Sequence, residues 1–411
     1  MAVLTGIVCL LAGWQPPATP PQSPIRPSEE TVERMRGRGT TALESEVPDY
    51  RLPPLPRRAD GTPDREAIVR TLREEMFGVV PDNLRVGVEA GPEETRDLGD
   101  GLTATARVFT ITATGPAGNV TFRPVLFRPA SGDSAGSKRR EGPKPYGCFV
   151  MLDHRGDARP EAGWVPEPET YWDVRQIIAA GMATVCVPIE TVAPNDRRPV
   201  PDAGIFAISG QPADPQWSTL AAWAWAMSET RKAVQAQAEI GPCYAIGHSR
   251  GGKTALWAAA TDSEFVGVVS NNSGCGGAAL SRRRLGETVE IITRVFPAWF
   301  NTRFREYAGR EDALPFDQHW LVAASHPRGV AVGSAADDVW ADPWGEWLSL
   351  KAAAAAWGRD LTWPRDGGRS VDTGPLHYHL REGGHALTAE DWGHYIRWAE
   401  RVRGLSIGDG E

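Results

Sequence analysis

Short apolar segments alternate with helical segments along most of this chain, and the alternation strongly constrains its fold. Buried-strand character is expected at 147–152, 183–189, 243–246, 265–270, 329–333 and 376–380. Spacing or Ala-rich composition predicts helices over 171–180, 217–238 and 250–260. Two segments with period-2 patterning, 102–113 and 120–127, are expected to be neighbouring strands. Such a chain is expected to form a mainly parallel sheet with helices on both faces.

Composition excludes several classes of protein. The 411 residues include 44 Lys and Arg against 52 Asp and Glu, and the resulting net charge of −8 disfavours a nucleic-acid partner. No apolar run reaches the ~18 residues that a membrane-spanning helix needs. The cysteines lack C-x-x-C spacing, so no structural zinc site is expected. If the chain forms a disulfide, Cys243 and Cys275 are the first pair to consider, although Cys243 lies in an apolar run where free thiols are common.

The most informative motif is Gly-His-Ser-Arg-Gly-Gly-Lys at 247–253. It contains G-x-S-x-G between a predicted strand and a predicted helix, the setting of a nucleophile elbow. Gly247 and Gly251 suit the sharp turn, and the helix N-terminus favours a developing oxyanion. The same run meets the phosphate-loop pattern G-x-x-x-x-G-K-[ST], but no Walker B Asp is evident. We therefore predict that Ser249 is a nucleophile.

A Ser hydroxyl needs a base, and the chain order in folds with this elbow is Ser, acid, His. The loop after the predicted strand 329–333 supplies Asp338, with Asp337 as the alternative acid. The turn after the last predicted strand supplies His385. We predict His385 as general base and acid, and Asp338 as the carboxylate that orients its imidazole. This chemistry needs no metal and no organic cofactor.

These motifs resemble those of the glucuronoyl esterases, carbohydrate esterase family 15, whose signature is G-[CH]-S-R-x-G-K. Further similarity lies in 271–279, 314–319, 338–343 and the Glu-Gly-Gly-His run 382–385. The resemblance implies an α/β-hydrolase fold and cleavage of esters of the glucuronic acid that decorates xylan, with a lignin-derived alcohol. It also implies that Arg250 helps to hold the oxyanion, that Lys253 contacts sugar hydroxyls and that Trp340 packs against the sugar.

Two positions depart from the family pattern. Many members carry a Glu as triad acid where this chain has Asn272, which cannot bear a negative charge, so the departure strengthens the prediction of Asp338. Members also often have a sugar-contacting Glu where this chain has Trp320. Gln318 and Glu311 are the candidates to bind substrate instead, with structural roles as the alternative.

The N-terminal region has a different character from the rest. Residues 2–13 form an apolar stretch of the length of a secretory signal, although no Lys or Arg precedes it. Residues 14 to about 60 are rich in Pro and predict a tether or a strap over the domain surface. We expect a signal segment with a Pro-rich extension at 1–60, an α/β-hydrolase catalytic domain at 61–411, and a secreted or periplasmic location.

The function expected from these features is that of a monomeric serine esterase acting on glucuronoxylan or lignin–carbohydrate esters, without a nucleic-acid or membrane partner. An acetylxylan-type or other carboxylesterase on the same fold is the first alternative. A catalytically weak carbohydrate-binding protein with a hydrolase fold is the second, although an intact Ser, Asp and His set argues against it.

Overall fold

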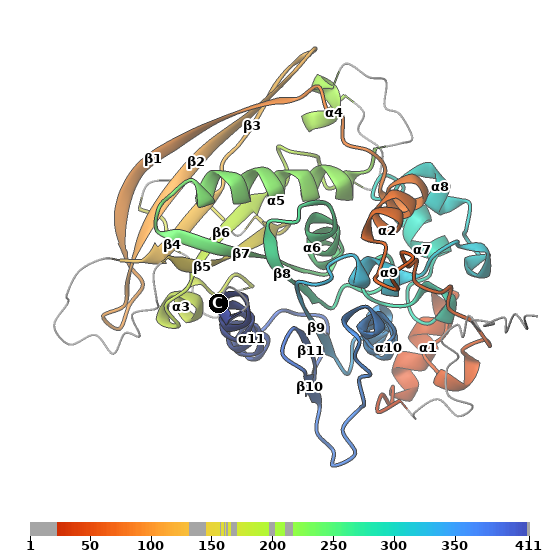
Figure 1. The fold of residues 1–411 in the computed structure, drawn as a ribbon. Helices are drawn as coiled ribbons and strands as arrows, with labels where there is room; N and C mark the ends of the chain where they lie inside the picture. Colours follow the sequence, from red (N-terminus) through yellow and green to blue (C-terminus); the bar gives the residue numbers. More distant parts are fainter. Residues whose placement is uncertain are drawn as a thin grey trace, which may run out of the picture.

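A mixed sheet forms the centre of the molecule, with strand order β1-β2-β4-β6-β5-β7-β8-β9-β11-β10 and β3 paired to β2 (Figure 1). The computed structural model describes residues 23–130, 145–156, 158–159, 161, 163–165, 171–196, 202–209 and 217–408. The strands are β1 (Arg85–Asp97), β2 (Thr103–Gly115), β3 (Gly118–Phe122), β4 (Val125–Pro129), β5 (Tyr146–Asp153), β6 (Ala183–Pro188), β7 (Ile240–His248), β8 (Phe265–Asn271), β9 (Gly329–Ala335), β10 (Ser370–Asp372) and β11 (Leu376–Arg381). The run β6-β5-β7-β8-β9-β11 is parallel throughout. The prediction of a mainly parallel sheet is therefore confirmed.

Helices cover both faces of this sheet (Figure 1). The helices are α1 (Glu29–Gly37), α2 (Arg65–Leu72), α3 (Val174–Ala179), α4 (Gly204–Ile208), α5 (Thr219–Gln235), α6 (Arg250–Thr261), α7 (Val289–Val295), α8 (Thr302–Arg305), α9 (Gln318–Ala323), α10 (Pro343–Ala353) and α11 (Ala389–Gly408). Shorter helical turns lie at η1 (Glu44–Glu46), η2 (Arg73–Phe77), η3 (Ser281–Arg283), η4 (Glu311–Ala313), η5 (Val339–Ala341) and η6 (Ala354–Trp357). Helices α5, α6 and α10 pack on one face, and α3 and α11 pack on the other.

Successive residues of the central strands enter two different hydrophobic cores. In β5, Val150 and Leu152 join the core beneath α5 and α6, while Phe149 and Met151 join the core beneath α3 and α11. Because side chains alternate along a strand, a strand buried on both faces must be apolar at every position. This explains why continuous apolar runs in the sequence predicted the central strands correctly.

The antiparallel edge of the sheet differs from the prediction in one respect. The segment 120–127 forms two strands, because β3 and β4 are separated at Arg123 and Pro124, and both pair with β2. Proline has no N–H to donate to a strand ladder, which accounts for the break. The long edge strand β1 was not predicted, because its exposed, charged residues show no apolar run.

The described part of the N-terminal region packs against the main body. Ile25, Met35 and Leu52 are buried in the core that also holds α5 and α6. The carbonyl of Pro53 accepts hydrogen bonds from His319 Nε2 at 3.0 Å and from Trp320 Nε1 at 3.3 Å. The segment 23–60 thus lies along the body as a strap that contains α1. The predicted signal segment 2–13 lies outside the described residues.

The cysteines Cys148, Cys186, Cys243 and Cys275 are buried free thiols, so the disulfide considered between Cys243 and Cys275 is not formed. Among the residues that the structure describes, no helix is both long and apolar enough to span a bilayer.

Candidate active site

Ser249 occupies a tight turn between β7 and α6. Its backbone has φ 56° and ψ −123°, a conformation that is rare for a residue other than glycine. A side chain at Gly247 would lie 2.1 Å from the backbone of Gly251, so the turn requires glycine there. The Ser249 side chain does not cap α6, although serine often does so at this position. The predicted strand–turn–helix context is confirmed, and the Ser249 hydroxyl is not engaged in holding the helix.

His385 and Asp338 meet beside this turn. His385 Nδ1 lies 2.6 Å from Oδ2 of Asp338, a buried carboxylate in the loop after β9. The His385 ring, on the turn after β11, lies 4.4 Å from the ring of His248, which immediately precedes Ser249. No hydrogen bond joins Ser249 and His385 in this conformation, and in unliganded enzymes such bonds often tighten only with substrate. Asp337, the alternative acid, has an exposed side chain.

Two further groups hold this carboxylate and its surroundings. Asn272 Nδ2 donates to Asp338 Oδ2 at 2.8 Å, so the residue that replaces the usual Glu contacts the acid instead of acting as one. Glu346 lies fully buried nearby and accepts hydrogen bonds from the backbone N–H groups of Ser273 and Gly274. Burial raises the pKa of Glu346 to about 7, and the charge of Asp338 adds to this rise.

Arg250 follows the nucleophile and is fixed by three contacts. Its Nη1 donates to Asn195 Oδ1 at 2.8 Å, and its guanidinium lies 4.8 Å from the centre of the Trp299 ring and 5.5 Å from that of Phe296. Burial lowers the pKa of Arg250, yet an arginine remains charged at any working pH. The residue directly after the elbow serine is therefore a cation fixed by its neighbours.

Lys253 and Trp340, both predicted to contact substrate, each contact Glu287, a residue that was not predicted from the sequence. Lys253 is buried, and its ammonium donates to the carbonyls of Ser273 and Cys275, the latter at 2.7 Å. Glu287 Oε2 lies 3.9 Å from Lys253 Nζ, and Glu287 accepts a hydrogen bond from the Trp340 side chain. Burial raises the pKa of Glu287 although Lys253 opposes the rise. Glu287 stands outside the motifs, so no sequence signal marked it.

Gln318 and Glu311 are both buried. Gln318 is fully buried and its amide approaches Ser281 Oγ at 3.3 Å, while Glu311 is also buried and forms an ion pair with Arg284 at 2.8 Å. Neither side chain bonds to Ser249, His385 or Asp338 in the part of the chain that the structure describes. In this conformation both side chains contact other buried residues, and substrate binding by Gln318 and Glu311 stays a prediction.

Residues between β5 and α3 also contact the elbow. The backbone N–H of His248 lies 3.3 Å from the hydroxyl of Tyr171, and Arg155 lies over the Tyr171 ring at 4.7 Å. Burial, aided by the charges of Arg250 and Arg155, lowers the pKa of His154 to about 3. The neutral His154 imidazole and the two positive guanidinium groups therefore lie near the elbow.

An elbow serine with a His–Asp pair at the carboxyl edge of a mainly parallel sheet is the arrangement that defines the α/β-hydrolase class. Comparison with known proteins narrows this class. The family model described as "Glucuronyl esterase, fungi" matches residues 166–359. A solved CE15 esterase, described as promiscuous and from a marine bacterial metagenome, is 31% identical with a TM-score of 0.74, over 89% of this chain and 100% of that one. The glucuronoyl esterase from Solibacter usitatus is 30% identical with the same TM-score, over 87% and 99% of the two chains.

Curated relatives agree with this assignment. A carbohydrate esterase from an unknown prokaryotic organism is 41% identical over 56% of this chain and 55% of its own length. The 4-O-methyl-glucuronoyl methylesterase 1 of Phanerochaete chrysosporium is 24% identical over 76% of this chain and 64% of its own length. The chain thus spans somewhat more than half the length of these two curated relatives. It belongs to carbohydrate esterase family 15.

Proposed function

We propose that this chain is a serine esterase that hydrolyses esters of glucuronic acid or its 4-O-methyl ether, such as those linking xylan side chains to lignin alcohols. The observation that carries the proposal is the 2.6 Å contact of His385 Nδ1 with Asp338 Oδ2 beside the Ser249 elbow. Family membership and the relatives named as glucuronoyl methylesterases support the substrate class.

The reaction is a two-step acyl transfer. Asp338 accepts a hydrogen bond from His385 Nδ1–H, which leaves the Nε2 lone pair to take the proton of Ser249. Ser249 Oγ attacks the uronoyl carbonyl, and the tetrahedral oxyanion is stabilised by first-turn N–H groups of α6 and by Arg250. His385 returns the proton to the leaving alcohol. Water, deprotonated by His385, then releases glucuronate from Ser249 and restores the hydroxyl.

The positive charge near the elbow supports the proposal that the acyl group of the substrate is acidic and hydroxylated. Arg250 and Arg155 lie near the elbow, and the product glucuronate acquires a negative charge when the ester is cleaved. Lys253 and Trp340 are the residues that the family resemblance assigns to the sugar, and both contact Glu287. A broader carboxylesterase is the second candidate, because one close structural relative is described as promiscuous.

A panel of esters tests the proposal. Benzyl glucuronate, an acetylated xylan and a feruloyl ester are compared on the purified full chain. The expected result is the highest kcat/KM on benzyl glucuronate. Equal or higher activity on the acetyl or feruloyl ester, with little on the glucuronate, would favour the second candidate.

A Ser249→Ala variant tests the site itself, with Ser263→Ala as the matched control because Ser263 lies on an exposed turn. Labelling by a fluorophosphonate probe is expected in the native chain and in the control, and not in Ser249→Ala. A native chain that neither turns over any ester nor reacts with the probe would support a binding protein instead.

We further propose that the chain acts as an exported monomer. The apolar stretch 2–13 and a plant-polymer substrate support export. Amino-terminal sequencing of the exported product and light scattering of the purified chain test these two points. The division into a segment 1–60 and a catalytic domain 61–411 also stays a proposal, in which the strap 23–60 is an extension that packs on the domain.

A further inference from the structure

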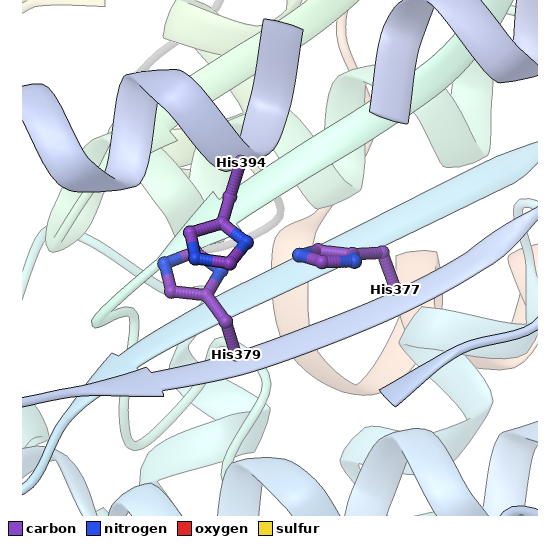
Figure 2. A group of neighbouring side chains, drawn as sticks. All are labelled: His377, His379 and His394. Atoms are coloured by element: carbon purple, nitrogen blue, oxygen red, sulfur yellow. The ribbon is translucent and has the colours of Figure 1, made fainter. Parts of the chain in front are cut away.

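Three histidines cluster on the face of the sheet covered by α11, apart from the elbow. His377 and His379 lie on β11 and His394 lies on α11, with their nearest ring nitrogens within 4.8 Å of one another (Figure 2). His377 and His379 are 3% and 2% exposed, and His394 is half-buried. Figure 2 shows the His377 ring pointing towards the other two, whose rings are stacked 4.2 Å apart.

Each strand histidine has one nitrogen on a carboxylate and the other without a partner. His379 Nε2 lies 2.8 Å from Asp391 Oδ1, and His377 Nδ1 lies 3.3 Å from Asp372 Oδ2. A carboxylate fixes the proton on the nitrogen that faces it, so the opposite nitrogen presents a lone pair. Those opposite atoms, His377 Nε2 and His379 Nδ1, are buried and have no hydrogen-bond partner. Buried polar atoms are nearly always satisfied, so this pair requires an explanation.

The carboxylates behind His377 and His379 also match the usual environment of histidine ligands. Imidazoles ligate metal ions when neutral. A carboxylate on the far nitrogen of a histidine is the usual support of such ligands, because it orients the ring and increases its basicity.

We propose that His377, His379 and His394 bind one divalent transition-metal ion, for which Zn²⁺ is the natural probe, and that this ion fastens α11 to β11. Three imidazole ligands and a water complete a tetrahedral Zn²⁺ site. Ligand nitrogens ~2.0–2.1 Å from Zn²⁺ are separated by about 3.3 Å, so the cluster must contract slightly. His394 supplies the movement, since its ring must turn out of the stack and no hydrogen bond holds it within the described part of the chain. Nitrogen donors without carboxylate ligands favour Zn²⁺, Ni²⁺ or Cu²⁺ over Mg²⁺ or Ca²⁺.

The ion would also support the turn that carries His385. Asp391, which orients His379, accepts from Arg381 Nε at 2.8 Å through its other oxygen. The Arg381 guanidinium in turn donates to the carbonyls of Gly384 and Ala386, on either side of His385. Metal binding is therefore expected to stabilise this turn without entering the ester chemistry.

Calorimetric titration of the EDTA-treated full chain with ZnCl₂ at pH 7.5 tests the site. The expected result is one Zn²⁺ per chain, a melting temperature raised by a few degrees with saturating Zn²⁺, and no binding of Mg²⁺. His394→Ala, a change that suits a helix, should weaken the affinity by about 100-fold or more. Asp372→Asn, which replaces the carboxylate that faces His377 and also pairs with Arg401, should weaken it ~10–100-fold.

His385→Ala is the matched control, because it removes an exposed imidazole outside the cluster and should leave Zn²⁺ binding unchanged. X-ray absorption at the zinc edge should report three imidazole ligands. The proposal is overturned if the native chain does not bind Zn²⁺, or if the folded His394→Ala variant, checked by circular dichroism, binds it as the native chain does. Loss of binding in His385→Ala with retention in His394→Ala would place the ion at the elbow and equally refute this site.

Discussion

Replacing Asp338 by Asn is expected to lower kcat on a glucuronate ester by about 10⁴, equivalent to roughly 5.4 kcal/mol of transition-state stabilisation. The magnitude follows from the geometry, since Asp338 Oδ2 receives both His385 Nδ1 at 2.6 Å and Asn272 Nδ2 at 2.8 Å. In the variant, an amide oxygen at the Oδ2 position keeps both hydrogen bonds but carries no charge, so the imidazolium that forms on His385 loses its counter-charge. An NH₂ group at that position would instead force the His385 proton onto Nε2, the atom that must accept the proton of Ser249.

A second change at Asn272 makes this prediction sharper. Because many family members use a Glu at this position, Asn272→Glu added to Asp338→Asn is expected to recover kcat ~10–100-fold by supplying a new carboxylate near His385 Nδ1. Steady-state kinetics on benzyl glucuronate measure both effects, and Asp337→Asn serves as the control because that side chain is exposed. If Asp338→Asn keeps more than about a tenth of native kcat, or if Asp337→Asn is the inactive variant, the assignment of the acid is wrong.

Three further perturbations test the surroundings of the site. Arg250→Lys should lower kcat/KM by about 10²–10³, because an ammonium cannot keep the planar contacts of the guanidinium near the oxyanion; native rates would show that Arg250 has no part in the reaction. The pKa of buried Glu346 is raised to about 7, so the free energy of unfolding should fall by about 3 kcal/mol as pH rises from 4.5 through 7. Urea unfolding of Glu346→Gln should show a flatter pH dependence than the native chain, and an unchanged profile would contradict this. Burial lowers the pKa of His319 to about 3, so stability should instead fall as pH drops from 6.5 towards 3; His319→Gln should lose part of this acid sensitivity in the same assay, and equal sensitivity would refute it.

Local sequence patterns were sufficient to predict the central strands and the turn at Ser249. Strands buried on both faces, such as β5 and β7, must be apolar throughout, and the turn at Ser249 needs glycines at fixed positions. Both requirements produce patterns that can be recognised within a few residues of sequence. Chain order then placed Asp338 and His385 on loops after neighbouring strands, and the structure brings those two side chains together.

Features that depend on distant partners could not be predicted in the same way. The strand β1 is exposed and charged, and only its pairing with β2 makes it a strand. Glu287 gains its place from contacts with Lys253 and Trp340, which lie far from it in the chain. The burial of Gln318 likewise results from tertiary packing that its motif position does not reveal.

The anchoring of the N-terminal strap has a practical consequence for producing this protein. An expression design that starts near residue 60 would remove Met35 and Leu52 and expose to water the core residues that they cover. It would also remove the Pro53 carbonyl that accepts hydrogen bonds from His319 and Trp320. Shortened versions are therefore expected to precipitate or melt early, whereas versions that begin before Ser23 should retain solubility.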